Sequence, residues 1–304
     1  MMADGPNVDC LIVGGGPAGL TTAIYLERYR RRILLADGGQ SRAELIPLTH
    51  NYPGFPEGIS GTKLLSLLRE QARRYGTGIR HCTVDTLLRH GDGFVATIGD
   101  DRVVAETIVL ATGVIDKCPD MPGLREATLS GCVRWCPICD GYEVTDLDVA
   151  VLAPASEALA HALFLRTYTR RLTLFAQPDG GELGAAERLA MEQADIQLVT
   201  EPIAQILMTD TRRVTVRLAS DRELVFDTLY PLLGCAGRTG LATHLGAHRD
   251  SDGMLLVNAD QCTSVPGLYA VGDVVNALNQ MSLAAAHAAT AATAIHNALH
   301  DNYR

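Results

Sequence analysis

The sequence predicts an α/β fold made of two similar halves, on three observations. Residues 11–37 and 150–176 align without a gap, and each stretch has the pattern of an apolar strand, an amphipathic helix and a second apolar strand. Both copies contain Tyr-x-Arg-Arg, beginning at Tyr29 and Tyr168. Each copy is followed by an alternating apolar hairpin and a last buried strand. Any two βαβ units look somewhat alike, but the gapless register and the shared motif favour a duplication.

Composition limits the classes of function. The chain has 304 residues, of which 47% are hydrophobic, enough for a large core and about two domains. The net charge is −9 without an extended basic cluster, which argues against nucleic acid and anionic membranes as partners. We find no run of ~18 apolar residues and no signal peptide, so we expect a soluble, cytoplasmic protein.

The first half carries a complete dinucleotide-binding pattern. Gly14-x-Gly16-x-x-Gly19 directly follows an apolar strand and begins a helix, and Asp37 closes the next strand. The glycines permit a tight turn, close approach of a pyrophosphate and helix–strand packing, and the acid can accept hydrogen bonds from a ribose. The free N–H groups of the helix N-terminus favour phosphate. A glycine-rich turn without a ligand is the disfavoured alternative.

The second half keeps the scaffold but not these residues. Ala153, Ala155 and Ala176 stand where the first copy has Gly14, Gly16 and Asp37. Alanine is less able to form a turn that needs positive φ, and the intervening Pro154 has no N–H to donate. We therefore expect a βαβ unit whose nucleotide site is lost.

The cysteine spacing points to redox chemistry. Of eight cysteines, only Cys136 and Cys139 have motif spacing, in Cys-Pro-Ile-Cys-Asp. Two residues between cysteines allow a small reversible disulfide ring, with an activated thiol at a helix start. A zinc half-site is the first alternative, but Cys132 is the only further cysteine nearby and no second pair follows, so no metal is expected. Two inert buried cysteines are the other alternative.

Five ordered stretches resemble one family across essentially the whole chain. They are VGGGPAG, NYPGFPEGISG, ATGV, CPICDG and GLYAVGDV. Together they resemble the low-molecular-weight thioredoxin reductases, flavoproteins of the pyridine nucleotide-disulfide oxidoreductase type. The resemblance implies two Rossmann-like three-layer ββα domains, the second inserted in the first. An FAD domain would comprise residues 1–116 and 247–304, and an inserted redox domain residues 117–246. It also implies a homodimer.

The resemblance assigns roles to individual residues. Cys139 would face the flavin, Cys136 would exchange with a partner's sulfur, and Asp140 would shuttle the proton. The partner would be a thioredoxin-like protein or a small dithiol or disulfide. Residues implied to line the FAD site, from pyrophosphate and ribose to flavin, are Gly14, Gly16, Gly19, Asp37, Gln40, Asn51, Thr112, Gly113, Gly272, Asp273, Gln280 and Met281. The last two belong to Gln280-Met281-Ser282, where the family has Arg-Gln-Ala.

The main departure from the family concerns NADPH. Where the family has its NADPH loop, GxGxxA, this chain has Ala153-x-Ala155-x-x-Ala158. Where the family has the His-Arg-Arg that binds the 2′-phosphate, this chain has Ala176-Gln177-Pro178. This favours an NADPH-independent branch, such as the diflavin-linked or ferredoxin-linked reductases or the fungal-type dithiol oxidases. The redox partner of the bound FAD would then be a second FAD, ferredoxin or O₂. One alternative is an NADPH-dependent thioredoxin reductase with an altered loop. The other is a flavin-loaded redox sensor without turnover.

Overall fold

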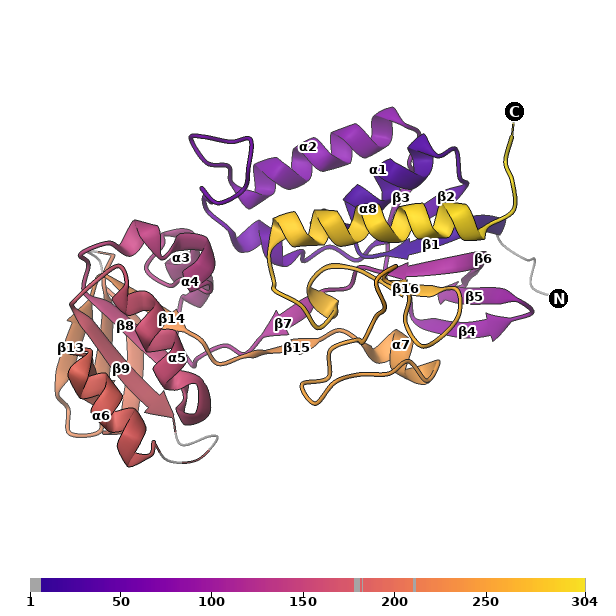
Figure 1. The fold of residues 1–304 in the computed structure, drawn as a ribbon. Helices are drawn as coiled ribbons and strands as arrows, with labels where there is room; N and C mark the ends of the chain where they lie inside the picture. Colours follow the sequence, from indigo (N-terminus) through magenta and orange to yellow (C-terminus); the bar gives the residue numbers. More distant parts are fainter. Residues whose placement is uncertain (1–6, 178–180, 182, 210–211, 304) are drawn as a thin grey trace. The chain divides into compact units, whose positions relative to one another are not determined.

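The computed structural model describes residues 7–177, 181, 183–209 and 212–303, and it has the predicted α/β fold (Figure 1). The chain forms two compact units. Unit 1 comprises residues 1–44, 60–115 and 235–304, and unit 2 comprises residues 45–59 and 116–234. Unit 2 is thus inserted in unit 1, and it also includes a short earlier segment.

Unit 1 is built on a sheet with β1 (Asn7–Val13) near its centre. This strand pairs in parallel with β2 (Ile33–Asp37) on one side and β6 (Asp101–Leu110) on the other. The first half of β6 also pairs with β5, and its last residues pair with β16. The remaining strands of this sheet are β3 (Ile79–His81), β4 (Thr86–His90), β5 (Gly93–Ile98) and β16 (Leu268–Ala270).

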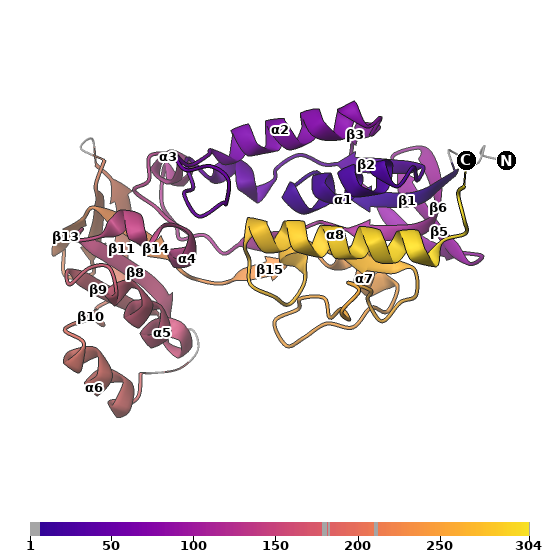
Figure 2. The same ribbon diagram turned by 45° about the horizontal axis from the view of Figure 1, so that its top comes forward.

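Three long helices lie side by side over the sheet of unit 1: α1 (Pro17–Arg28), α2 (Gly61–Arg74) and α8 (Met281–Ala298) (Figures 1 and 2). Small side chains such as Ala284, Ala288 and Ala291 form the buried stripe of α8, so its backbone can pack closely. The short elements of this unit are η1 (Arg42–Leu45), α7 (Gly240–His244) and η3 (Gly272–Val274).

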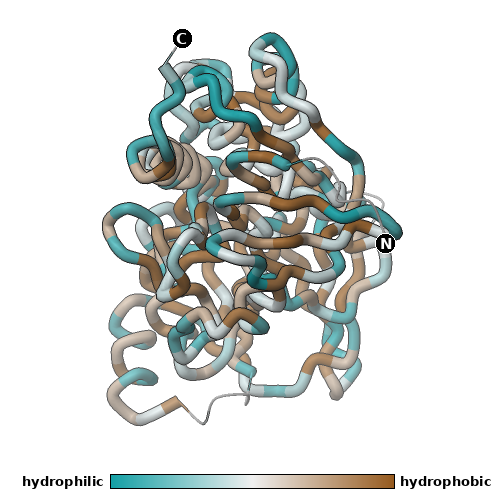
Figure 3. The backbone as a smooth tube through the Cα atoms, turned by 90° about the vertical axis from the view of Figure 1, so that its right-hand side faces the viewer, coloured by the Kyte–Doolittle hydropathy of each residue, from teal (hydrophilic) through white to brown (hydrophobic). Residues whose placement is uncertain are grey.

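The core of unit 1 follows its strands. Hydrophobic residues concentrate along the strands and hydrophilic ones in the connecting turns (Figure 3). Leu11, Phe94 and Ile108 are fully buried in one cluster. A strand buried on both faces is expected where helices and further chain cover a parallel sheet.

Unit 2 has a parallel sheet of order β10-β9-β8-β14 and an antiparallel sheet of order β11-β12-β13. Alternate residues of its central strand β8 enter two cores. Val149 and Val151 pack on the α5 side, whereas Ala150 and Leu152 pack on the side of the antiparallel sheet. The elements are α3 (Leu124–Leu129), α4 (Pro137–Asp140), η2 (Tyr142–Val144), β8 (Val149–Pro154), α5 (Ala155–Arg166), β9 (Leu172–Gln177), α6 (Ala185–Gln193), β10 (Gln197–Val199), β11 (Ile203–Met208), β12 (Val214–Leu218), β13 (Glu223–Phe226) and β14 (Thr228–Pro231).

The strand pairing supports the predicted duplication. In unit 1, Leu11 of β1 lies beside Leu34 of β2. In unit 2, Ala150 of β8 lies beside Thr173 of β9, and these are the positions that the gapless alignment matches to Leu11 and Leu34. The two halves differ further on. In unit 1 the second strand of the hairpin and the last buried strand are one continuous strand, β6, whereas in unit 2 they are separate strands, β13 and β14, in different sheets.

The units divide at residues 115/116 and 234/235, whereas the sequence placed the second boundary at 246/247. The strands β7 (Val114–Asp116) and β15 (Cys235–Gly237) pair with each other and lie at the passages 115/116 and 234/235 between the units. Residues 235–246 therefore belong to unit 1. Within the described residues, no helix is long and apolar enough to span a membrane.

We expect Phe175→Ala to lower the free energy of unfolding of unit 2 by about 3–5 kcal/mol, because it leaves a cavity in the core. Phe175 is 2% exposed and meets the ring of Phe226 edge to face, with centroids 5.8 Å apart. The only tryptophan, Trp135, lies in unit 2, so its fluorescence during denaturation reports this unit. Leu189→Ala, at a residue 53% exposed on α6, is the control and should change stability by less than ~0.5 kcal/mol. Equal effects of the two substitutions would contradict the described core.

Candidate active site

The turn between β1 and α1 has the geometry that a pyrophosphate needs. Gly14 has φ +114°, and a Cβ there would lie 2.3 Å from the carbonyl oxygen of Ala111. A Cβ on Gly19 would lie 1.9 Å from the carbonyl oxygen of Gly14. Gly16 is the N-cap of α1 and no side chain caps the helix, so its first N–H groups are available to an anion.

Asp37 is fixed beside this turn, at the end of β2. Its side chain is buried, and Oδ1 accepts a hydrogen bond of 3.0 Å from the backbone N–H of Gly39. Oδ2 forms an ion pair with the guanidinium of Arg69 at 3.4 Å. A Cβ on Gly15 would overlap the Asp37 carboxyl group. The carboxylate therefore lies against the glycine turn, where the ribose of a dinucleotide is expected.

Other predicted cofactor residues of unit 1 reach the same turn. Gly272 has φ +75°, and a Cβ there would lie 2.9 Å from the Cβ of Ala18, in the first turn of α1. The neighbouring Asp273 faces Arg42 at 3.4 Å. Ala111, whose carbonyl oxygen lies beside Gly14, is followed directly by Thr112 and Gly113.

For three further predicted cofactor residues, Gln40, Gln280 and Met281, the structure gives the backbone conformation or the place in a helix. Gln40 has φ +61° in the turn after β2. Gln280 is the N-cap of α8 and Met281 its first residue, and no side chain caps that helix. Gln280 and Met281, at the positions of the family's Arg and Gln, therefore stand at the N-terminus of α8.

The residues present fit an FAD. The fit rests on the Gly14–Gly19 turn, which added methyl groups would close, and on a buried acid at its side. Gly14, Gly16 and Gly19 would hold the pyrophosphate and Asp37 the adenosine ribose.

The corresponding junction in unit 2 has a different geometry. β1 ends at Val13 and α1 begins at Pro17, which leaves a three-residue turn. β8 instead continues through Pro154, and α5 begins at Ala155 without an intervening residue. Ala153 is a fully buried strand residue that pairs with Ala176. The strand thus extends through the positions where unit 1 has its turn.

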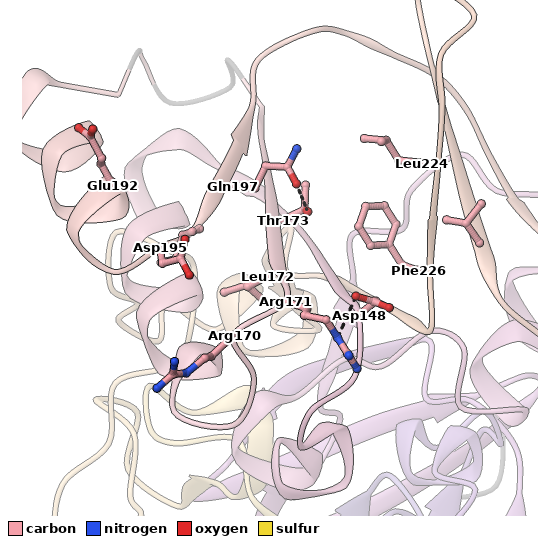
Figure 4. Close-up of a pocket in the computed structure, with 12 residues that line it drawn as sticks. Asp148, Arg170, Arg171, Leu172, Thr173, Glu192, Asp195, Gln197, Leu224 and Phe226 are labelled. Carbon is pink, nitrogen blue, oxygen red and sulfur yellow. Dashed lines mark hydrogen bonds and ion pairs between the residues drawn. The ribbon is translucent and has the colours of Figure 1, made fainter.

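Unit 2 also has a cavity of about 580 Å³, but at the other end of its parallel sheet (Figure 4). Its lining includes Arg170, Arg171 and Asp195, which lie just before β9 or β10. A βαβ unit holds a dinucleotide at the carboxyl ends of its strands, so this cavity is not the counterpart of the glycine turn.

The predicted redox pair forms a disulfide. Cys136 and Cys139 are bonded, with their Cα atoms 5.2 Å apart. Cys136 is the N-cap of α4, and its Sγ accepts a hydrogen bond of 3.2 Å from the N–H of Cys139. That N–H stabilises a thiolate on Cys136 after reduction. Among the described residues, no group of three or more His, Cys, Asp or Glu side chains is placed so that it could hold a metal ion.

Asp140 directly follows the pair and is held by two donors. The hydroxyl of Tyr230 donates to Oδ1 at 2.8 Å, and the guanidinium of Arg134 contacts Oδ2 at 3.2 Å. Burial raises the pKa of Asp140, while the charge of Arg134 and the hydrogen bond from Tyr230 act to lower it. A carboxyl group with such opposing influences is suited to exchanging protons.

The end of α5 shapes the redox loop, residues 134–141. A Cβ on Gly141 would lie 2.6 Å from both the carbonyl oxygen of Pro137 and the ring of Tyr168. Tyr168 belongs to the Tyr-x-Arg-Arg motif that the halves share. Trp135 packs against the core of unit 2 and donates its indole N–H to Thr128 at 3.1 Å. The glycine after Asp140 therefore permits close packing of the loop on unit 2.

The segment 45–59 also contacts this loop within unit 2. His50 Nδ1 lies 2.7 Å from a carboxylate oxygen of Glu143, and the amide of Asn51 donates to the carbonyl of Ile138 at 3.5 Å. Asn51, expected at the flavin, is thus placed beside the redox cysteines.

Sequence reasoning missed Arg69, Arg134 and Tyr230. Arg69 and Tyr230 have no motif, because each meets its carboxylate partner through the fold, whereas Arg134 is six positions from Asp140 in the redox loop. Arg69 is 32 positions from Asp37, and Tyr230 is 90 positions from Asp140. A tyrosine in an otherwise apolar strand was the one available signal, since a buried hydroxyl needs a partner.

Known proteins resemble this chain over most of its length. Residues 8–293 match the family model described as pyridine nucleotide-disulphide oxidoreductase. The thioredoxin reductase of Mycolicibacterium smegmatis is 30% identical over 297 residues, 94% of each chain. That of Treponema pallidum is 31% identical over 279 residues, covering 88% of this chain and 89% of the relative.

A solved structure shows the same fold. The crystal structure of HlmI has a TM-score of 0.88 at 30% identity and covers 96% of this chain and 92% of its own. Family model, relatives and fold agree with the glycine turn and the redox cysteines. The chain therefore belongs to the pyridine nucleotide-disulphide oxidoreductase family, as a flavin-dependent thiol/disulfide oxidoreductase of the low-molecular-weight thioredoxin reductase type.

Proposed function

We propose that this enzyme moves electrons between FAD and the Cys136–Cys139 pair without NADPH. The observation that carries the proposal is the junction of β8 and α5, where strand passes directly into helix. A pyrophosphate needs a turn whose N–H groups face it, and Pro154 at this junction has none. Ala153 and Ala155 are buried and place methyl groups where unit 1 has glycine.

The ribose side of the same junction gives further support. Ala176, at the position of Asp37, is apolar, and Gln177 after it carries no charge. Recognition of a 2′-phosphate relies on arginine, because a guanidinium binds it with paired hydrogen bonds. Pro178, the third position of the family's His-Arg-Arg, lies outside the described residues.

The exchange step uses the chain's own sulfur atoms. A substrate thiolate attacks Sγ of Cys136, an S–S bond forms between them, and Cys139 leaves as a thiolate with the electron pair of the broken bond. The second substrate thiol displaces Cys136, so the substrate becomes a disulfide and both cysteines are reduced. Asp140 takes up a proton from an attacking thiol or returns one to a departing thiolate. When bound, FAD supplies a two-electron acceptor or donor for the cysteine pair.

The proposal includes the partners. The thiol partner is a thioredoxin-like protein or a small dithiol or disulfide. The redox partner of FAD is a second flavin, ferredoxin or O₂. We also propose a cytoplasmic homodimer, in line with the family resemblance.

The second candidate is NADPH-dependent reduction of thioredoxin, which the names of the relatives favour. It requires NADPH to bind at an altered junction. A flavin-loaded sensor without turnover is disfavoured, because a sensor has no need for the held acid Asp140.

We expect NADPH to leave the flavin oxidised and dithiothreitol to reduce it when each is mixed anaerobically with the purified protein. The reason is that the β8–α5 junction offers no pyrophosphate site, whereas the disulfide accepts electrons from a dithiol. Absorbance of the flavin in a stopped-flow instrument measures both reactions. The double variant Cys136→Ser/Cys139→Ser should lose reduction by dithiothreitol. Rapid bleaching of the wild-type flavin by NADPH would establish the second candidate instead.

We expect Cys139→Ser to trap a mixed disulfide between Cys136 and a thiol substrate. The variant keeps the backbone N–H that stabilises the Cys136 thiolate but has no second sulfur to resolve the adduct. Mass spectrometry after incubation with oxidised glutathione measures the adduct, with the double variant as background for the other cysteines. A stronger adduct in Cys136→Ser would reverse the roles assigned to the two cysteines.

We expect Gly14→Ala to abolish FAD binding, because its methyl group meets the Ala111 carbonyl and a residue at φ +114° is strained. The matched control is Ala153→Gly, at the equivalent position of unit 2, which should retain FAD. Flavin content per protein measures the effect, and Trp135 fluorescence verifies that unit 2 remains folded. Full FAD content in Gly14→Ala would contradict the site.

A further inference from the structure

We propose that Tyr230 and Arg134 are positioning residues for thiol–disulfide exchange, which together hold the Asp140 carboxyl group in place beside the cysteine pair. The proposal rests on the proposed function, because it assigns to Asp140 the proton that the exchange moves. It assigns a role in the reaction to Tyr230 and Arg134, which lie in separate segments of the chain.

Tyr230 presents its hydroxyl from a rigid element. It lies on β14, which pairs in parallel with β8, and it is fully buried. Its hydroxyl is 2.8 Å from Oδ1 of Asp140 and 3.2 Å from the backbone carbonyl of the same residue. Burial raises the pKa of Tyr230, so the phenol stays protonated and acts as a donor. A donor fixed on a sheet holds its acceptor in one orientation.

Arg134 reaches the second carboxylate oxygen from the start of the redox loop. Its backbone N–H donates to the carbonyl of Leu229 at 2.9 Å, next to Tyr230 on β14. Its guanidinium is 3.2 Å from Oδ2 of Asp140. Both donors are therefore positioned by β14, and each binds a different carboxylate oxygen of Asp140. A carboxylate has about four acceptor positions, so lone pairs remain for a thiol proton.

Burial of the Arg134 guanidinium has an energetic cost, which indicates that this side chain has a functional role. Its Nε is buried and lacks a hydrogen-bond partner among the described residues. Leaving such a group without a partner destabilises the folded state. An apolar side chain would avoid that cost, but it would leave the half-buried Asp140 without a cation.

The charges around Asp140 act in opposite directions. Burial and the nearby Glu143 favour the protonated acid, whereas Arg134 and Tyr230 favour the carboxylate. Glu143 itself lies 2.7 Å from Nδ1 of His50. Loss of either donor should therefore raise the pKa of Asp140.

Tyr230→Phe tests the proposal because it removes the hydroxyl and keeps the ring. We expect the pH-rate limb of Asp140 in flavin reduction by dithiothreitol to move upward by about one pH unit, the size expected for losing a hydrogen bond to a charged group. The direction is the same whether Asp140 accepts or donates the proton. Asp140→Asn identifies the limb by abolishing it.

The matched control is Tyr168→Phe, whose ring packs on the same loop at Gly141. It should leave the limb in place, so an equal shift in this variant would overturn the proposal. Arg134→Gln should shift the limb upward as well, and Arg134→Lys should restore part of the shift. A uniform loss of rate at every pH in Tyr230→Phe would show a merely structural role and would also overturn it.

The carboxyl ¹³C shift of Asp140, assigned by its absence in Asp140→Asn, gives a readout without turnover. An upward shift of its titration in Tyr230→Phe supports the positioning role, and an unchanged titration overturns it. If dithiols fail to reduce the wild-type flavin at any pH, the proposed function fails, while this titration still decides the role of Tyr230 and Arg134.

Discussion

The close approach of backbone to backbone at the β1–α1 turn is the constraint on which the cofactor chemistry of this fold depends. A Cβ on Gly19 would lie 1.9 Å from the Gly14 carbonyl, and a Cβ on Gly14 would lie 2.3 Å from that of Ala111. The helix can begin beside the strand only because these residues lack side chains. The same closeness directs the helix N–H groups to one point, beside the buried Asp37. Packing and phosphate binding therefore have one physical cause.

Unit 2 shows what remains when that constraint is relaxed. The pairing of β8 with β9 keeps the register of unit 1, so the parallel strands and the covering helix survive. Without glycine, the strand continues through Ala153 and Pro154 and the turn disappears. Apolar burial on both faces of β8 is sufficient to stabilise the scaffold. Unit 2 thus keeps the βαβ fold on its hydrophobic pattern, without the glycine turn of unit 1.

Sequence could predict the features that repeat or have fixed spacing. The two βαβ units, the glycine turn, the cysteine pair and the alanine-rich last helix all follow from patterns within about thirty residues. It could not predict contacts made by tertiary structure. Tyr230 contacts Asp140 although 90 positions separate them in the sequence. Strand β15, which pairs with β7, begins at residue 235, so unit 2 ends at residue 234 and not at the predicted residue 246. Loss of glycine indicated a failed turn, but not that the strand would extend in its place.

The redox loop is held by other elements of unit 2 than those that form the β8–α5 junction. Its start is fixed by the backbone bond from Arg134 to Leu229, and its acid by Tyr230 on the same strand, β14. Its end packs on Tyr168, after the last turn of α5. The altered residues lie instead at the carboxyl end of β8 and the first turn of α5. Substitutions there can remove a pyrophosphate site without moving the donors of Asp140. The redox loop and the β8–α5 junction therefore depend on different contacts within unit 2, so a change at the junction need not alter thiol–disulfide exchange.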